Sequence, residues 1–261
     1  MSAAAIVPDT DEAVAGIRDG ATVLIGGFGS AGQPIELIDA LRRSGARDLT
    51  VVNNNAGNGD TGLAALLATG QVRKIICSFP RQSDSWVFDE LYRSGRIELE
   101  LVPQGNLAER MRAAGAGIGA FYCPTGVGTP LAEGKEHRVI DGREYLLEYP
   151  IQGDVALIKA HRADSLGNLV YRKTARNFGP VMATAAALTV VQVDEIVDAG
   201  QLNPEAVVTP GIFVDRVVAL PVGVGASEPN GRGGDWTEER GASDEGRSRL
   251  QAARRRAGNT A

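Results

Sequence analysis

Neutral amide side chains and glycines are concentrated in four short segments of the chain, each of which follows an apolar run. These segments are residues 26–29, 53–57, 78–83 and 103–106. Side-chain amides and exposed backbone N–H groups can stabilise the oxyanion that develops during acyl transfer, without taking part in proton transfer themselves. This combination of residues therefore predicts acyl-transfer chemistry.

The most specific of these segments is a glycine-rich loop between an apolar strand and a helix. Gly27, Gly29 and Gly32 satisfy the spacing G-x-G-x-x-G, which is typical of dinucleotide-binding Rossmann proteins. Two features disagree with that interpretation: asparagines 53–55 replace the acidic residue expected after the second strand, and Pro34 delays the start of the helix. An NAD-binding Rossmann oxidoreductase stays an alternative, as does a loop whose glycines serve only a tight turn.

No obvious nucleophile accompanies these segments. Phe28 occupies the position of the first glycine of a G-x-S-x-G nucleophile elbow. Cys77 and Cys123 lie in apolar sequence, which predicts small core residues rather than reactive thiolates. His137 is expected on a solvated edge, and His161 is either an anion-binding residue or an ordinary surface residue. The amide-rich segments thus look like one half of an active site.

Short β-rich runs alternate with helical patterns through the first half of the chain. Strands are predicted at 22–28, 49–53, 72–78 and 97–102, with helices that start near residues 34, 60 and 83. This alternation predicts an open, largely parallel α/β sheet flanked by helices. Ligands of such sheets bind beyond the carboxyl ends of the strands, where the amide-rich segments would lie.

After residue 115 the pattern changes to shorter β-like segments separated by turns, which predicts a mixed-sheet second half. Examples are residues 143–148 and 154–160, and a helix at 180–187, a strand at 188–193 and a last element at 214–220 follow. The predicted domain therefore covers residues 1–220. Residues 221–261 are rich in Gly, Arg, Ser, Asp and Glu, and we predict a low-complexity, disordered tail.

Composition and charge argue against several classes of function. The 261 residues carry a net charge of −5, which favours neither nucleic-acid binding nor membrane binding. Two cysteines and two histidines without paired spacings predict neither a disulfide scaffold nor a metal site. Because the sequence has no bilayer-spanning apolar run and no signal-peptide pattern, we expect a cytoplasmic, metal-free protein.

The same segments resemble the α subunit of family I CoA-transferases. The resemblance rests on G-G-F-x(3)-G-x-P at residues 26–34, N-N-A-G at 54–57 and P-Q-G-N-L-A-E-R at 103–110. Further matching segments are F-Y-C-P-T-G-V-G-T at 121–129, G-D at 153–154 and Y-R-K-T-A-R-N-F at 171–178. They occur in order over about residues 5–220, and so many independent motifs argue against a chance similarity.

This resemblance implies one half of a two-component enzyme that moves CoA from succinyl-CoA to a 3-oxoacid. Residues 77–85 are similar to relatives that use 3-oxoadipate, a compound of aromatic catabolism, and acetoacetate is the alternative acceptor. In this family the nucleophile is a glutamate in a Ser-Glu-Asn-Gly motif of the β subunit. It attacks the acyl-CoA, giving an acyl anhydride and then an enzyme–CoA thioester.

The chain itself lacks that motif, because residues 227–231 contain an inserted proline. The resemblance therefore places the nucleophile on a β subunit, in an α2β2 assembly. It implies no permanently bound cofactor, since coenzyme A enters as a thioester substrate.

The resemblance also assigns roles to residues of the amide-rich segments. Gln104, Asn54 and Asn55 are expected to orient the acyl group and to stabilise oxyanions, and loop-fixing hydrogen bonds are their alternative role. The glycine-rich loop is expected to approach substrate and CoA with its backbone. Its expected binding residues are Gly26, Gly27, Phe28, Gly29 and Gly32.

Basic side chains supply a second set of candidates, inferred from substrate chemistry rather than from the family. Both 3-oxoadipate and succinate keep a free distal carboxylate, which an arginine can bind through two hydrogen bonds. We assign this role to Arg81, with an exposed surface arginine as the alternative. Arg172, Lys173 and Arg176 either face the CoA phosphates or lie in a solvated turn. A non-enzymatic ligand-binding module is the remaining alternative function.

Overall fold

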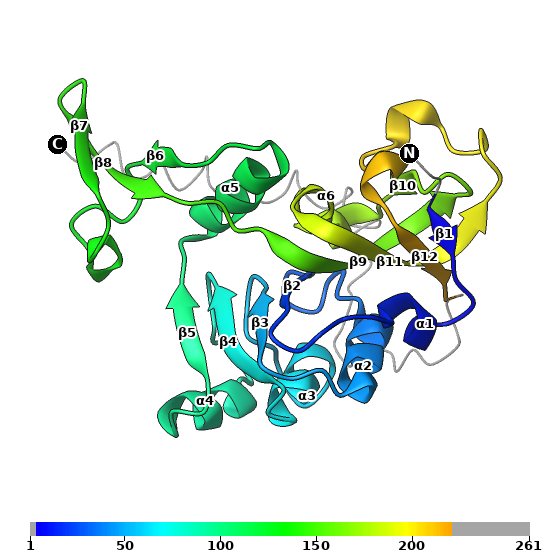
Figure 1. Cartoon of the computed structure of the whole chain (residues 1–261), viewed down its shortest axis with the longest axis horizontal. Helices are drawn as coiled ribbons and strands as arrows, with labels where there is room; N and C mark the ends of the chain where they lie inside the picture. The colour runs from blue at the N-terminus through cyan, green and yellow to red at the C-terminus, as the bar shows by residue number, and fades with distance from the viewer. Residues whose placement is uncertain (1–3, 221–261) are drawn as a thin grey trace, which may run out of the picture. The chain divides into compact units, whose positions relative to one another are not determined.

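A computed structural model describes residues 4–220 of the chain (Figure 1). The predicted tail, residues 221–261, lies outside the described residues, and so does the segment 227–231. Within the described part, a nine-stranded sheet carries helices on both of its faces, and a separate three-stranded sheet follows the fifth helix.

The large sheet is built almost entirely from parallel strands. Its order is β1-β12-β11-β9-β2-β3-β4-β5, with β10 paired antiparallel to β9. The strands are β1 (Ala5–Ile6), β2 (Thr22–Ile25), β3 (Leu49–Val52), β4 (Val72–Cys77), β5 (Glu98–Leu101), β9 (Gly153–Asp164), β10 (Leu169–Val170), β11 (Ala186–Val197) and β12 (Arg216–Ala219). The central strands consist mainly of valine, leucine and isoleucine because helices cover both faces of the sheet.

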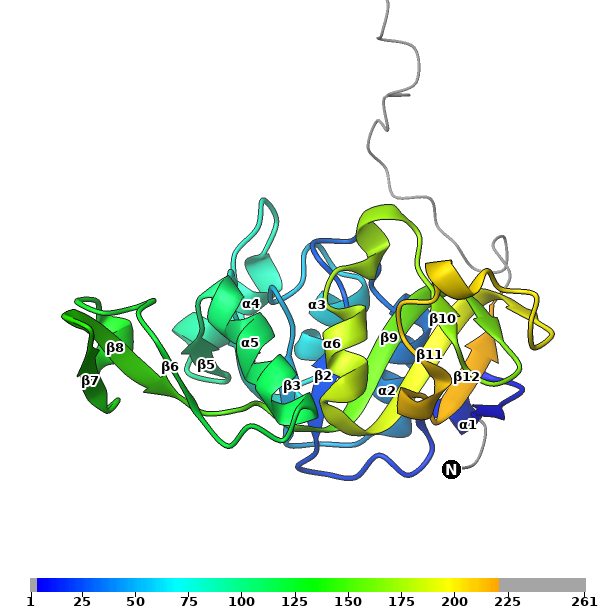
Figure 2. The ribbon, with the colours of Figure 1, turned by 90° about the horizontal axis from the view of Figure 1, so that it is seen from above.

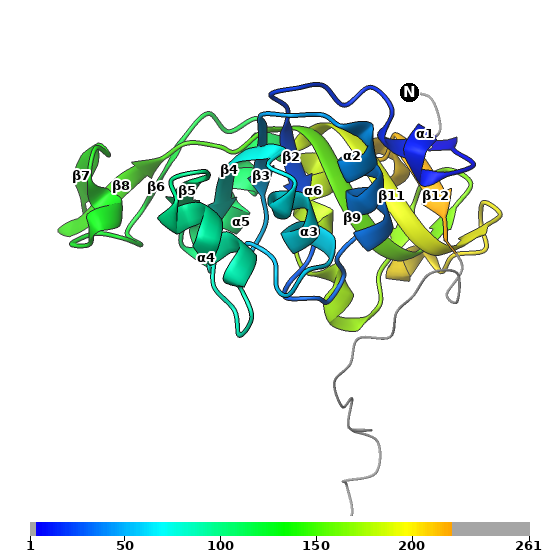
Figure 3. The same ribbon diagram turned by 90° about the horizontal axis from the view of Figure 1, so that it is seen from below.

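In the described part of the chain, six α-helices cover the two faces of this sheet. One face carries α1 (Thr10–Val14), α2 (Ile35–Ser44), α3 (Gly62–Ala68) and α4 (Trp86–Arg93), as Figure 3 shows. The other face carries α5 (Gln104–Gly115) and α6 (Gly179–Thr184), which are in front in Figure 2. Within residues 4–220, the helices are too short or too polar to cross a lipid bilayer.

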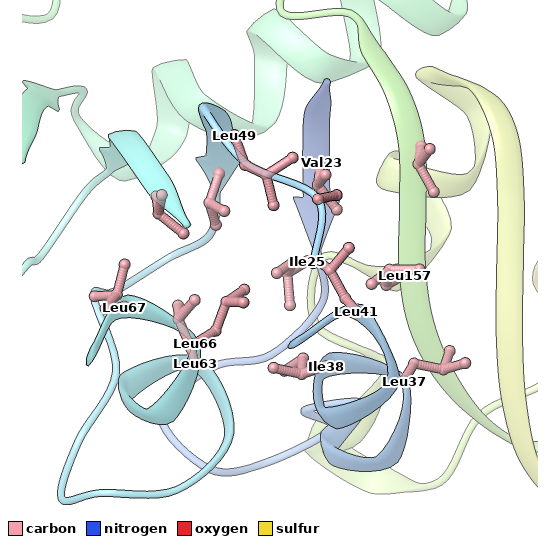
Figure 4. Packing of buried hydrophobic residues seen from close by; sticks show 14 of the residues in the cluster. Val23, Ile25, Leu37, Ile38, Leu41, Leu49, Leu63, Leu66, Leu67 and Leu157 are labelled. Atoms are coloured by element: carbon pink, nitrogen blue, oxygen red, sulfur yellow. The ribbon is translucent and has the colours of Figure 1, made fainter. Parts of the chain in front are cut away.

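The core between the sheet and α2 and α3 follows the spacing of apolar residues along those helices (Figure 4). In α2 the buried residues recur at helical spacing as Leu37, Ile38 and Leu41. They pack with residues of α3 and of three strands, namely Leu63, Leu66, Leu67, Val23, Ile25, Leu49 and Leu157. Each fully buried side chain of this size contributes about 1.5 to 3 kcal/mol to folding.

The small sheet is antiparallel, in the order β6-β8-β7. Its strands are β6 (Phe121–Cys123), β7 (His137–Ile140) and β8 (Arg143–Glu148). The buried carboxylate of Glu148 accepts hydrogen bonds from Asn106 Nδ2 (3.0 Å) and Lys135 Nζ (2.6 Å). The bond from Asn106 connects the small sheet to α5.

The predicted fold class is confirmed: a largely parallel sheet flanked by helices precedes a second half that contains antiparallel pairing. Two details differ. The long strands β9 and β11 extend the parallel sheet beside β2, so antiparallel pairing between strands is confined to β10 and the small sheet within the described residues. The helix predicted at 180–187 ends at Thr184, because Ala186 already pairs with Gly153 as the first residue of β11.

The strand order reverses at β2. The next strands in sequence, β3, β4 and β5, lie on one side of β2, whereas β9, β11 and β12 lie on the other. In open α/β sheets such a reversal opens a crevice beyond the carboxyl ends of the strands, and ligands bind there. The glycine-rich loop leaves β2 at this point.

Candidate active site

Asn54 connects three of the amide-rich segments. It follows β3, whereas Ser78 follows β4 and Gln104 begins α5 after β5. The Asn54 Oδ1 accepts hydrogen bonds from Ser78 Oγ (2.7 Å) and Gln104 Nε2 (2.9 Å). Asn54 is only 4% exposed, whereas Gln104 is exposed. The structure thus brings together two of the predicted amide residues, with Gln104 at the accessible end of the pair.

The asparagines on either side of Asn54 shape the loop. Asn53 is fully buried, and its Nδ2 donates to the carbonyl oxygen of Ile25 at the end of β2 (2.6 Å). Its Oδ1 accepts from the Asn55 N–H (2.9 Å), and the Asn55 Oδ1 accepts from the Gly57 N–H (2.9 Å). The buried Asn55 Nδ2 has no hydrogen-bond partner within the described residues. The Asn55 side chain therefore fixes the loop through its Oδ1, whereas its Nδ2 donor is unpaired within the described residues.

The glycine-rich loop forms a tight turn between Phe28 and Ala31. The Phe28 N–H donates to the Ala31 carbonyl (3.0 Å), and the Ala31 N–H donates to the Phe28 carbonyl (3.2 Å). Gly29 lies within this turn in the left-handed region, at φ +62°. The Gly27 N–H donates to Asn177 Oδ1 (3.0 Å). The N–H groups of Gly27, Phe28 and Ala31 are bonded internally, so the N–H groups of this turn without a partner in the described residues are those of Gly29 and Ser30.

Two contacts differ from those of a dinucleotide-binding site. The Leu37 N–H at the start of α2 donates to Gln192 Oε1 of β11 (3.3 Å), and Gln192 Nε2 donates to Glu36. A protein side chain thus occupies the helix end on which a pyrophosphate would rest. Asn53, which stands where the ribose-binding acid would be, donates its amide to the end of β2. The G-x-G-x-x-G spacing therefore serves a different kind of site in this fold.

The two cysteines differ in their surroundings. Cys77 is buried, and burial raises the pKa of its thiol to about 12, which removes it as a thiolate nucleophile near neutral pH. The prediction of a core position is wrong for Cys123. Its thiol is only partly buried and donates to Asn106 Oδ1 (3.2 Å), because β6 belongs to the small sheet rather than to the main core.

Arg81 is more tightly paired within the chain than the sequence indicates. Its Nε donates to Asp89 Oδ1 of α4 (2.6 Å), and Arg93 Nη2 lies 3.5 Å from the other oxygen of Asp89. The Arg81 side chain is nevertheless 56% exposed. The second basic cluster is exposed at all three of its residues, Arg172, Lys173 and Arg176.

The histidines are paired with carboxylates. His137 Nδ1 lies 2.6 Å from Glu144 Oε1 on the exposed small sheet, which agrees with the predicted solvated edge. His161 Nδ1 lies 2.9 Å from Asp194 Oδ2, and its side chain is half-buried. Over residues 4–220, no three His, Cys, Asp or Glu side chains are grouped so that they could hold a metal ion.

Three contributors to the site cannot be assigned from the sequence. Asn53 and Ser78 stand out there only as members of amide-rich segments, and Asn177 only as part of a matching motif. Their roles depend on partners 28, 24 and 150 residues away, respectively. No local pattern carries that information, although the run of three asparagines after β3 indicates that this loop has unusual hydrogen-bonding needs.

The described residues form an open α/β sheet whose strand order reverses at β2, and the neutral side chains of Asn54, Ser78 and Gln104 are hydrogen-bonded to one another after β3, β4 and β5. Neutral amides of this kind are suited to acyl transfer. Residues 7–220 match the family described as "Coenzyme A transferase". The chain belongs to this family, and the predicted family membership is confirmed.

Individual relatives agree with this assignment. The chain is 68% identical over 208 residues to the A subunit of the 3-oxoadipate CoA-transferase of Pseudomonas putida, and the match covers 80% of this chain and 90% of the relative. It is 51% identical over 213 residues to the A subunit of a probable succinyl-CoA:3-ketoacid coenzyme A transferase of Bacillus subtilis, over 82% of this chain and 89% of the relative.

A solved structure shows the same fold. The acyl-CoA transferase YdiF of Escherichia coli O157:H7 superimposes with a TM-score of 0.75 at 26% identity, over 84% of this chain. The chain spans about half of the YdiF chain, since the match covers 47% of it.

Proposed function

We propose that the chain is the A subunit of a 3-oxoadipate CoA-transferase, which moves CoA from succinyl-CoA to 3-oxoadipate. The observation that carries this proposal is the 68% identity to the Pseudomonas putida protein, compared with 51% to the Bacillus subtilis relative that is described for 3-ketoacids. The neutral donors around Asn54 and the glycine-rich loop support the same reaction class.

A glutamate carboxylate of a B subunit supplies the nucleophile in this proposal. It attacks the thioester carbonyl of succinyl-CoA, so that an anhydride forms and the CoA thiolate leaves. The thiolate then attacks the glutamyl carbonyl, giving an enzyme–CoA thioester and free succinate. The carboxylate of 3-oxoadipate repeats these two steps in reverse, which yields 3-oxoadipyl-CoA and restores the glutamate.

The described residues suit this sequence of steps because no step needs a proton donor or acceptor. Each attack passes through a tetrahedral oxyanion, and neutral N–H donors stabilise such a charge without titrating near neutral pH. Gln104 presents an exposed amide whose orientation is set by Asn54, and Asn54 is in turn held by Ser78. The turn that contains Gly29 lies at the same edge of the sheet, and the N–H groups of Gly29 and Ser30 have no partner within the described residues.

The substrate carboxylate requires a cation, and we propose Arg81 for this role. Its side chain is exposed and lies in the loop that follows β4, beside the loops after β2 and β3. Asp89 already engages the Nε of Arg81, so the substrate carboxylate would meet the outer guanidinium nitrogens.

A reconstitution assay tests the proposed function. The chain by itself, a candidate B subunit by itself and their mixture are incubated with succinyl-CoA and 3-oxoadipate, and formation of 3-oxoadipyl-CoA is followed. We expect turnover only in the mixture, with a higher kcat/KM for 3-oxoadipate than for acetoacetate. With succinyl-CoA as the only substrate, mass spectrometry of the mixture should show CoA attached to the B subunit.

Three outcomes contradict parts of this proposal. A preference for acetoacetate would keep the reaction and reject the substrate. Turnover by the chain by itself would reject the nucleophile in trans. CoA attached to this chain rather than to its partner would reject the division of roles between the two chains.

A further inference from the structure

Asn177 joins the glycine-rich loop to a distant part of the chain. It follows the 3-10 helix Lys173–Arg176 and precedes α6. Its Oδ1 accepts from the Gly27 N–H (3.0 Å), and its Nδ2 donates to the carbonyl oxygen of Ala31 (3.0 Å). One side chain therefore holds both ends of the turn that contains Gly29, from 150 residues away in the sequence.

The backbone of Asn177 adopts a conformation that normally requires glycine. Its φ is 24° and its ψ is −118°, which resembles the first central residue (i+1) of a type II′ turn. A residue with a side chain is strained there, at a cost of order 1 to 3 kcal/mol, and such strain concentrates where function requires it. Glycine would suit the backbone better, so the residue at this position is explained by its side chain.

The backbone at Gly32 lies very close to Asn177 and to the residues before it. A Cβ atom at Gly32 would lie 2.3 Å from the Ala175 carbonyl oxygen and 2.6 Å from Asn177 Nδ2, so the two segments approach as closely as backbone allows. The Asn177 Nδ2 also lies 3.0 Å from the Ala175 carbonyl and 3.2 Å from that of Thr174. The amide thus fastens the 3-10 helix and the glycine-rich loop at the same point.

We propose that Asn177 is a positioning residue for catalysis: its amide holds the turn 28–31 so that the N–H groups of Gly29 and Ser30 face the reacting acyl group. This proposal deepens the proposed transferase function and rests on it. The contacts assign Asn177 no direct role toward substrate. Its effect passes through the backbone of the loop, where a displacement of about 1 Å is enough to slow a reaction about a hundredfold.

The variant Asn177→Gly separates the side chain from the backbone conformation. Glycine tolerates the φ and ψ of Asn177 but removes every contact of the amide. We expect kcat of the reconstituted enzyme to fall about 10- to 100-fold, with KM for succinyl-CoA changed less than about threefold and with no loss in the denaturation midpoint. Asn177→Asp, which keeps the acceptor for the Gly27 N–H but loses the donor to Ala31, should reduce kcat as well.

Asn168→Gly is the matched control. Asn168 also connects distant segments through its amide, since its Oδ1 accepts from the Gly211 N–H (2.9 Å) and its Nδ2 donates to Asp164 (2.8 Å). Its amide bonds the turn after β9 to Gly211 rather than to the glycine-rich loop. We expect this variant to lose stability and to keep its kcat.

Hydrogen exchange of the Gly27 amide provides a readout that does not need activity. It should accelerate about tenfold or more in Asn177→Gly, whereas amides of β2 and β3 exchange as in the unmodified chain. Unchanged exchange, or accelerated exchange with unchanged kcat, would overturn the proposal. If the unmodified mixture is inactive, the proposed transferase function fails, and the exchange of the Gly27 amide still decides whether Asn177 holds the loop.

Discussion

Gln104 is the residue at which an oxyanion-stabilising role is most directly testable. Replacing it by alanine removes an exposed amide and leaves the buried Asn54 and its partner Ser78 in place. We expect kcat of the reconstituted enzyme to fall about 100- to 1,000-fold, because one oxyanion donor contributes about that much. Steady-state kinetics measures this effect, and circular dichroism should show an unchanged fold.

Glu109→Ala is the matched control for Gln104. Glu109 is exposed on the same helix and pairs only with Arg112 (2.9 Å) within the described residues, so its removal should leave kcat near that of the unmodified enzyme. A Gln104→Ala enzyme whose kcat stays within about threefold would show that the amide pair serves the loop and not the reaction.

Arg81 tests substrate recognition rather than catalysis. In Arg81→Ala the distal carboxylate of 3-oxoadipate loses a charge-assisted partner, and we expect its KM to rise about 10- to 100-fold, with little change in KM for acetoacetate. Arg93→Ala is the control, because Arg93 shares Asp89 with Arg81 but lies on α4. An equal loss with both acceptors would reject this assignment, and no loss with either acceptor would favour a surface ion pair.

Ion pairs connect β4, β5 and α5 at one edge of the large sheet. Glu100 of β5 is bonded to Lys74 Nζ of β4 (2.6 Å) and to Arg110 Nη1 of α5 (2.9 Å). Burial by itself would raise the pKa of the Glu100 carboxyl, but the hydrogen bonds and charges of Lys74 and Arg110 outweigh it and lower that pKa below its usual value of 4.5. The ionised form of Glu100 thus fastens β4, β5 and α5 together.

A lowered carboxyl pKa predicts a specific dependence of stability on pH. The unfolded chain takes up the Glu100 proton first, near pH 4.5, so the stabilisation is fully present above that pH and is lost as the pH falls through the lower pKa of the folded state. Glu100→Gln should therefore lose less unfolding free energy between about pH 7 and about pH 3.5 than the unmodified chain. Urea denaturation at several pH values measures the difference.

Glu98→Gln is the control for this prediction. Glu98 lies on the same strand and pairs with Arg73 (3.2 Å), but both side chains are more than half exposed. Such a pair contributes little to stability, so this variant should follow the unmodified chain. If Glu100→Gln and the unmodified chain lose the same free energy in acid, the three elements are not held by this carboxylate.

The stability of the whole domain depends on the apolar layers on the two faces of the large sheet. Leu66 of α3 is fully buried in one of these layers. Leu66→Ala should lower the unfolding free energy by about 2 to 5 kcal/mol, from lost burial and the cavity left behind. Equilibrium urea denaturation measures the loss.

Leu166→Ala provides the comparison on the surface. Leu166 is 50% exposed in the turn after β9, so its truncation should change the unfolding free energy by less than about 0.5 kcal/mol. If both leucine variants lost the same free energy, burial in the layer beneath α3 would not be what stabilises the domain.

Local patterns in the sequence determined several elements of this protein and the chemistry at their ends. The apolar runs of β2 to β5 and the helical spacing in α2 predict a parallel sheet with covering helices, because side-chain periodicity within one element decides which face is buried. The amide-rich segments follow those strands directly, and parallel strands place such segments at one edge. The reaction class could therefore be predicted before any fold was known.

Contacts between distant residues were decided only by the tertiary structure. The insertion of β9 beside β2 brings the segment of Asn177 to the glycine-rich loop, and adjacency of β3, β4 and β5 brings Gln104 to Asn54 across 50 residues. Strand order sets these partners, and strand order results from the packing of the whole chain rather than from the properties of any one segment.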